Sequence, residues 1–96
     1  MIVVITAPAA TDLREIGDYI AADSPLLAEK VVGELEDACL RLSRSPERFP
    51  YAEKLGIGIR RAVHKRYLIF YRIGAGVEVL RIIHSARNYE AMFPKS

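Results

Sequence analysis

Three strand-like segments follow one another in the second half of the chain, and they constrain its fold more than any other feature. They are Gly58–Val63, Tyr67–Ile73 and Val77–Ser85, and each is rich in β-branched or other large apolar residues. The turns that join them, His64–Arg66 and Gly74–Gly76, are short enough to favour antiparallel neighbours. The sequence therefore predicts an antiparallel sheet between Gly58 and Ser85.

Large apolar side chains occupy both faces of these predicted strands, whereas a sheet with one face in water alternates apolar and polar residues. Simple alternation places Val77, Val79, Arg81 and Ile83 of the last segment on one face, opposite Glu78, Leu80, Ile82 and His84. Two helices cover one face of such a sheet. We therefore expect the other face to be covered by something acidic or amphipathic outside this chain, unless a loop or the C-terminal segment covers it.

The first half of the chain supplies one more strand and two helices. Ile2–Thr6 is a short β-branched run, expected at a sheet edge or beside the last strand. Apolar residues at helical spacing predict helices over Ala9–Ala22, with Pro8 in the first turn, and over Pro25–Ser43, capped by Asp23 or Ser24. Ser45–Gly58 is expected to be a loop, and Asn88–Met92 a helical turn ended by Pro94.

These elements predict a single α+β domain over residues 1–96, in which an antiparallel helical hairpin packs on a mainly antiparallel sheet. The formal net charge of +2 conceals an asymmetry. Residues 1–58 carry six Lys or Arg and ten Asp or Glu, whereas residues 59–96 carry eight and two. Such a division indicates that the second half meets an acidic surface, unless the acidic half merely solvates the outer faces of the helices.

Several classes of protein do not fit this composition. The single cysteine excludes an internal disulfide, and no Cys or His spacing suggests zinc. The sequence has no dinucleotide or phosphate-loop fingerprint, so we expect no cofactor and no metal. The N-terminal apolar run is too short for a signal peptide or a membrane span, so we expect a cytoplasmic protein with no membrane partner.

Two groups of residues could carry function. His84 and Arg87, at the end of the last strand, could combine an acid or base with a phosphate-binding group, although a lone histidine at a strand end is more often structural. Arg60, Arg61, Lys65 and Arg66, with Tyr67 and Tyr71 close by, could bind nucleic acid or an acidic protein segment. His64 is expected to be solvated in a turn, and Cys39 to be an inert buried thiol.

The chain also resembles the RelE/ParE superfamily of type II toxins, and the ParE branch most of all, over nearly its full length. The matching residues are Asp12-Leu13, Ile16, Tyr19-Ile20, Pro25, Ala28, Pro46, Gly58-x-Arg60, Tyr67–Arg72 and Val79–Arg87. The resemblance implies an α/β toxin neutralised by a ParD-like antitoxin with an acidic C-terminal tail, and bound to DNA only through that antitoxin. Arg60, Tyr71, Arg81 and Arg87 are the expected antitoxin contacts.

The superfamily contains two activities, and the resemblance leaves both open. ParE-like members poison DNA gyrase and block replication, for which Arg60, His84 and Arg87 are the expected target contacts. RelE-like members cleave mRNA on the ribosome, for which His84, Arg87 and Tyr89 would be the catalytic set. Leu68 and Phe93 replace an arginine and a tyrosine of the nuclease pattern, which favours the gyrase inhibitor over the endoribonuclease. A third possibility is an inactive relative that only binds an antitoxin.

Overall fold

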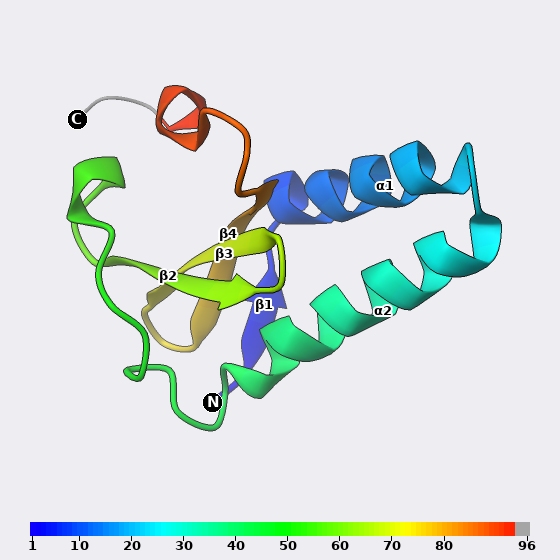
Figure 1. Ribbon diagram of the computed structural model, residues 1–96. Helices are drawn as coiled ribbons and strands as arrows, with labels where there is room; N and C mark the ends of the chain where they lie inside the picture. The colour runs from blue at the N-terminus through cyan, green and yellow to red at the C-terminus, as the bar shows by residue number, and fades with distance from the viewer. Residues whose placement is uncertain (94–96) are drawn as a thin grey trace.

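Two helices lie side by side and pack on one face of a four-stranded sheet (Figure 1). The computed structural model describes residues 1–93, so the predicted stop at Pro94 lies outside the described residues. The elements are β1 (Val3–Ile5), α1 (Ala7–Ala21), α2 (Pro25–Arg41), β2 (Ile59–His64), β3 (Tyr67–Ile73) and β4 (Val77–His84). Short 3₁₀ turns at Glu53–Leu55 and Tyr89–Met92 complete the set. The predicted α+β fold is confirmed.

Both helices have a proline in their first turn, as expected from its fixed φ and missing N–H. Pro8 lies in the first turn of α1, and Pro25 opens α2. Ser24 is the N-cap of α2, because its hydroxyl oxygen accepts a hydrogen bond of 3.2 Å from the Leu27 N–H. Within residues 1–93, neither helix is long and apolar enough to cross a bilayer.

The strand order in the sheet is β1-β4-β3-β2. β2, β3 and β4 are antiparallel neighbours, as their short turns predict. β1 is an edge strand and pairs parallel with β4, so both expectations for this segment are confirmed. The parallel pairing is possible because the helical hairpin and two strands separate β1 from β4 in the chain.

A register shift in β4 makes the predicted alternation of this strand wrong. Phe70 pairs with Arg81 but Tyr71 pairs with Val79, so β4 holds one extra residue opposite β3. Beyond this bulge the faces exchange, and Ile82 joins Val79 in the core beneath the helices while Ile83 faces the other way. Strict alternation, in contrast, places Val79 and Ile83 on one face.

The chain covers both faces of its own sheet, so the expectation that a partner covers one of them is wrong, and the loop and the C-terminal segment do so instead. The main core lies between the helices and the sheet, and includes Leu35, Ile69, Tyr71 and Val79. On the opposite face a second cluster contains Leu55, Ile59, Leu68, Phe70 and Ile83. Tyr89, Met92 and Phe93 pack against this second cluster. The 45–58 loop and the C-terminal turn thus do what a partner was expected to do.

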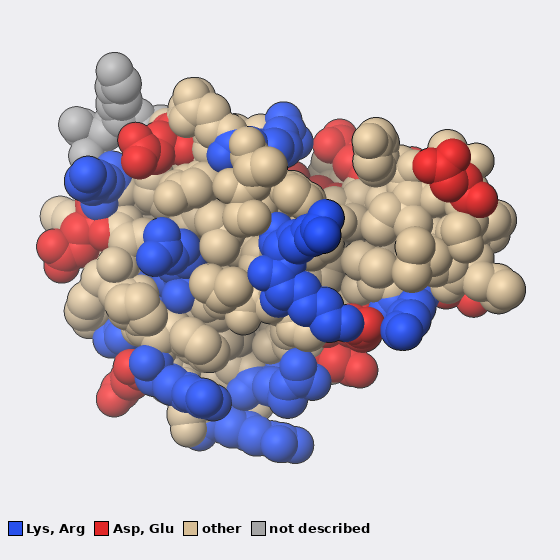
Figure 2. Space-filling model, viewed as in Figure 1, with Lys and Arg blue, Asp and Glu red and all other residues tan. Residues whose placement is uncertain are grey.

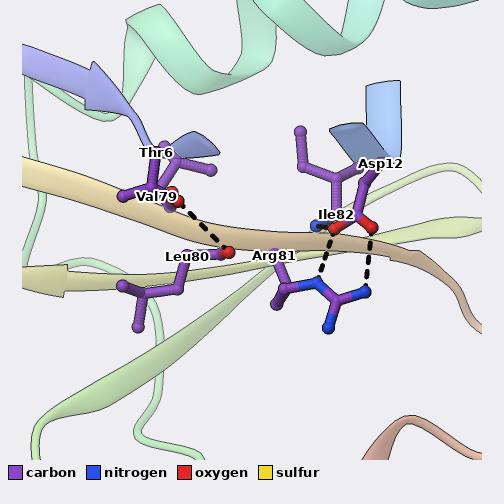
Figure 3. Close-up of polar contacts among 6 residues, drawn as sticks. All are labelled: Thr6, Asp12, Val79, Leu80, Arg81 and Ile82. Atoms are coloured by element: carbon purple, nitrogen blue, oxygen red, sulfur yellow. Dashed lines mark hydrogen bonds and ion pairs between the residues drawn. The ribbon is translucent and has the colours of Figure 1, made fainter. Parts of the chain in front are cut away.

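Asp12 hydrogen-bonds to the main chain of β4 beyond the point where β1 ends (Figure 3). Thr6 ends the parallel pairing: its N–H and hydroxyl both donate to the Val79 carbonyl, at 3.1 and 2.7 Å. The chain then turns into α1, whose Asp12 carboxylate accepts the Ile82 N–H at 2.9 Å. The same carboxylate accepts two bonds from the Arg81 guanidinium, at 2.8 and 2.9 Å. Asp12 is buried, although a carboxylate on an amphipathic helix is expected on the exposed side.

We predict that Asp12→Ala lowers the free energy of unfolding by about 2–4 kcal/mol, because it leaves the Ile82 N–H and a half-buried guanidinium without an acceptor. Urea unfolding followed by circular dichroism measures the change. Asp18→Ala, an exposed carboxylate on the same helix, is the matched control and should change stability by less than about 0.5 kcal/mol. Similar losses in the two variants would contradict a structural role for Asp12.

Candidate functional site

A groove of about 520 Å³ lies between α1 and the neighbouring ends of β3 and β4. Its lining comes from three elements and the residues after β4: Asp12, Glu15, Ile16, Tyr19, Tyr67, Ile82, Ile83, His84 and Arg87. The groove therefore brings together His84 and Arg87, two of the residues predicted to act together. It also adds aromatic side chains from α1 and β3 that were not predicted to join them.

His84 is held by two contacts at the end of β4. Its ring stands edge-on to Tyr67, with the ring centroids 5.3 Å apart. Its Nδ1 accepts a hydrogen bond of 3.1 Å from the Ala86 N–H. Since Nδ1 is the acceptor, neutral His84 carries its proton on Nε2. His84 also lines the groove, where an Nε2–H can donate to a bound molecule.

Arg87 lies in the turn after β4, where its N–H donates to the His84 carbonyl at 3.0 Å. Its side chain is exposed and has no carboxylate within ion-pair distance among residues 1–93. A free guanidinium beside an imidazole N–H can bind a carboxylate or a phosphate of another molecule.

Arg81 does not join this free pair. Its guanidinium is bound by Asp12, and that hydrogen bond raises the pKa of Arg81 above its ordinary value despite partial burial. Tyr71 is fully buried, and its hydroxyl donates to the Pro46 carbonyl. Burial raises the pKa of Tyr71. Arg81 and Tyr71 therefore do not suit the expected role of antitoxin contacts, because their functional groups are hydrogen-bonded inside the chain.

Arg60 is likewise committed to its own chain, and it lies apart from the groove. Its guanidinium donates to the carbonyls of Glu47 and Phe49, at 3.1 and 2.7 Å, and to the Tyr51 hydroxyl at 2.9 Å. It also lies 4.0 Å from the centre of the Tyr51 ring. In the sheet register His84 is opposite Tyr67, Tyr67 is opposite His64, and Arg60 lies four residues before His64. The structure therefore does not bring Arg60 together with His84 and Arg87.

The residues expected to form a nuclease active site, His84, Arg87 and Tyr89, are not all brought together either. Tyr89 packs on Phe70, with ring centroids 5.4 Å apart, on the sheet face opposite the helices. His84 contacts Tyr67, whose side chain points to the helix-covered face. Leu68 and Phe93, at the two positions of the nuclease pattern, belong to the apolar cluster beneath Tyr89. His84 and Tyr89 thus lie on opposite faces of the sheet.

Other reactive groups do not form a centre of their own. Among residues 1–93, no group of three His, Cys, Asp or Glu side chains is placed to hold a metal ion. Cys39 is buried within α2, and burial raises the pKa of its thiol to about 12. His64 is not solvated as expected: its Nε2 is buried and lies 4.0 Å from the Glu34 carboxylate, too far for a hydrogen bond.

Comparison with known proteins agrees with this geometry. A family model described as "ParE toxin of type II toxin-antitoxin system, parDE" matches residues 3–89 of the 96-residue chain. This chain belongs to the ParE toxin family. The match extends from β1 to Tyr89 and so includes the whole groove.

Two relatives accompany the ParE family match. Toxin ParE1 of Caulobacter vibrioides is 38% identical over 39 residues, a segment that spans 41% of this chain and 41% of that toxin. A solved structure described as "Chromosomal ParDE TA system from P. aeruginosa" superposes with a TM-score of 0.76 at 24% identity. The superposition covers 88% of this chain and 95% of that one, which shows that the fold is shared.

Sequence reasoning about this ParE-family chain missed the contribution of α1 to the groove. Asp12 follows Ala9 by three residues and precedes Ile16 by four, so it stands at the spacing of the buried stripe. A carboxylate at a buried position of a helix predicts a hydrogen-bond donor beside it, because an unpaired buried charge is costly. Tyr19 gave no comparable signal, because an exposed tyrosine on a helix is common.

We predict that Arg60→Ala loosens the 45–58 loop, because it removes the donor shared by the carbonyls of Glu47 and Phe49. The expected loss of unfolding free energy is about 1–3 kcal/mol, with faster amide hydrogen exchange near Tyr51. Arg61→Ala, a neighbour on β2 with no ion pair among the described residues, is the control. If Arg60→Ala changes neither the free energy of unfolding nor the exchange rates, Arg60 does not hold the loop and its guanidinium is available to a partner.

We predict that the Cys39 thiol of the folded protein reacts with iodoacetamide far more slowly at pH 8 than the thiol of the unfolded chain. The unfolded thiol titrates at pH ~8.5, whereas burial raises the pKa of the folded thiol to about 12.

The stability that comes from keeping the Cys39 thiol neutral is therefore complete below about pH 8.5 and declines as pH rises towards 12. Cys39→Ala should make the fall in stability between about pH 9 and pH 11 shallower than in the wild type. Equal slopes would exclude this linkage.

Proposed function

We propose that this chain is the toxin of a type II pair, that it inhibits DNA gyrase and blocks replication, and that a cognate antitoxin neutralises it in the cytoplasm. The observation that carries the proposal is the ParE family match over residues 3–89. The Caulobacter relative is itself named a toxin, and the solved relative is described as a ParDE system. In this proposal the chain contacts operator DNA only through its antitoxin.

The groove between α1 and β4 supports a binding role at the target. Tyr19 is almost fully exposed at its rim, Arg87 is free of ion pairs within residues 1–93, and His84 offers a donor. Tyrosine and arginine are the side chains that most often dominate the free energy of protein–protein contacts. We propose that gyrase contacts these three residues.

The endoribonuclease remains the second candidate, since Arg87 beside His84 could hold a phosphate. It is the weaker one, because general acid–base cleavage needs its groups within hydrogen-bond reach of the reacting phosphate. Tyr89 packs on the opposite face, and neutral His84 uses its acceptor nitrogen on Ala86.

We predict that the purified protein inhibits plasmid supercoiling by gyrase and accumulates gyrase–DNA cleavage complexes. Arg87→Ala should weaken this inhibition by about tenfold or more, because it removes a charged contact at the target surface. Arg14→Ala, an exposed arginine on α1 outside the groove, is the matched control and should inhibit like the wild type. Gel assays of supercoiling at a series of toxin concentrations give both values.

Two outcomes would overturn the gyrase proposal. The first is the absence of any effect on gyrase together with new codon-specific mRNA ends after brief expression, which would establish the endoribonuclease. The second is normal growth on induction and no effect in either assay, which would identify an inactive relative that binds only an antitoxin.

A further inference from the structure

β1 is one of the two outer strands of the sheet, and its free edge is open. The residues on either side of it bond to β4: Ile2 accepts the Val77 N–H at 2.8 Å, and Thr6 donates its N–H to the same strand. Main-chain groups alternate in direction along a strand, so the N–H and C=O of Val3 and Ile5 point away from β4. Within residues 1–93 these outward groups have no main-chain partner.

The side chains around this open edge are apolar and partly exposed. Val3 and Ile5 pack against the main core, so Ile2 and Val4 lie on the opposite face of the sheet. There Ile2 is 76% exposed and Val4 is 50% exposed. Among residues 1–93, the second cluster contains no residue of β1, so the cover of that face ends short of this strand.

β1 lacks most of the features that usually protect an edge strand, which are a charged side chain, a proline or a bulge. Residues 1–11 carry no charged side chain, and Pro8 lies beyond the end of the strand. The helices also leave room beside the edge, because a groove of about 450 Å³ is lined by Ile5 together with Leu13 of α1 and Val32 of α2. Only the short length of β1 limits what can be added to it.

The absence of charge distinguishes this edge from the other open surfaces of the chain. Arg41, Arg44 and Arg48 line a second groove at the end of α2, and Arg87 lines the groove beside His84. Figure 2 shows Lys and Arg gathered along the lower side of the molecule, where the end of α2 and the following loop lie in Figure 1. Two copies of such a basic surface would repel each other, whereas two copies of β1 meet without an unfavourable charge.

We propose that β1 pairs antiparallel with β1 of a second copy of this chain, in a two-fold symmetric dimer whose sheet is continuous across both copies. Val4 lies on the symmetry axis, opposite Val4 of the second copy, and Val3 lies opposite Ile5. Val3 and Ile5 carry the outward main-chain groups, so the two pairs exchange about four main-chain hydrogen bonds. The proposal does not depend on the target of the toxin.

The register centred on Val4 is the one in which both outward-facing residues find a partner within β1. An axis through Val3 would place Ile5 opposite Met1, and an axis through Ile5 would place Val3 opposite Ala7. Centring on Val4 also brings two half-exposed β-branched side chains together, a pair that stabilises antiparallel strands.

The dimer leaves the groove beside His84 open. β1 pairs with the start of β4, at Val77–Val79, whereas the groove lies beside the end of β4. A dimer thus carries two free copies of that groove. Because the shared strand is short, we expect a reversible contact with a dissociation constant on the order of 100 µM.

The first test introduces one cysteine on the proposed axis. Val4→Cys places two thiols directly opposite each other, where the Cα atoms of such a pair lie about 4.5 Å apart, within disulfide range. Ile2→Cys is the matched control, because it is more exposed but the register separates the two copies of residue 2 by about 13 Å. Under mild oxidation at about 100 µM protein, we expect non-reducing gels to show disulfide dimers of Val4→Cys at least about tenfold faster than of Ile2→Cys. The wild type, whose Cys39 is buried, should give none. Oxidation of Val4→Cys no faster than that of Ile2→Cys would overturn the proposal.

The second test measures the dimer by sedimentation equilibrium, with circular dichroism to check that each variant is folded. The average mass should rise with concentration towards twice that of the chain, and added salt should not lower it, because no charged side chain lies in the contact. Val4→Lys brings two ammonium groups together and should weaken the dimer by about tenfold or more. Val63→Lys, at an exposed valine of the other edge strand, should leave it unchanged. A chain that stays monomeric at about 1 mM, a dimer that dissociates as salt rises, or one that Val4→Lys leaves intact would each overturn the proposal.

Discussion

The Asp12 carboxylate is the contact on which the arrangement of this molecule depends. β1 ends at Ile5, too early to pair with the whole length of β4. Asp12 then accepts the Ile82 N–H, as the next residue of a longer β1 would have done. The same group holds Arg81 and fixes α1 across the sheet edge. One buried side chain thus sets the end of the sheet, the position of α1 and the floor of the groove beside His84.

The positive charge of the chain divides into two kinds when its contacts are considered. Arg60 and Arg81 are half-buried, hydrogen-bonded and part of the fold. Arg87 follows the end of β4, and Arg41, Arg44 and Arg48, at and after the end of α2, line a second groove; none of the four forms an ion pair among residues 1–93. Only the second kind can neutralise charge on another molecule without first breaking an internal ion pair or hydrogen bond. The excess of positive charge in residues 59–96 is therefore a poor guide to where a partner binds.

The periodic signals of the sequence were sufficient for the fold and insufficient for the site. Regular spacing in the helices, short turns and prolines at helix starts are local properties, and each element that they predict is present. The β4 bulge is not local, because it is defined by the pairing of β4 with β3, and Asp12 accepts the Ile82 N–H just beyond it. The burial of Tyr71 and the packing of Tyr89 on Phe70 likewise require knowledge of which segment covers which face. His84 and Arg87 were predicted together because they are close in sequence.

The covered second face changes what a partner can contribute to this chain. A toxin with a bare apolar face would gain much of its core from an antitoxin, and its folding would be coupled to binding. Here Leu55, Tyr89, Met92 and Phe93 already bury that face, so the folded state needs no partner to complete its core. A ligand then stabilises the protein only through its binding, by a free energy that rises with the logarithm of one plus the ratio of its concentration to its dissociation constant. A partner of this chain therefore has grooves and edges to occupy, where side chains such as Arg87, Arg44 and Arg48 remain available.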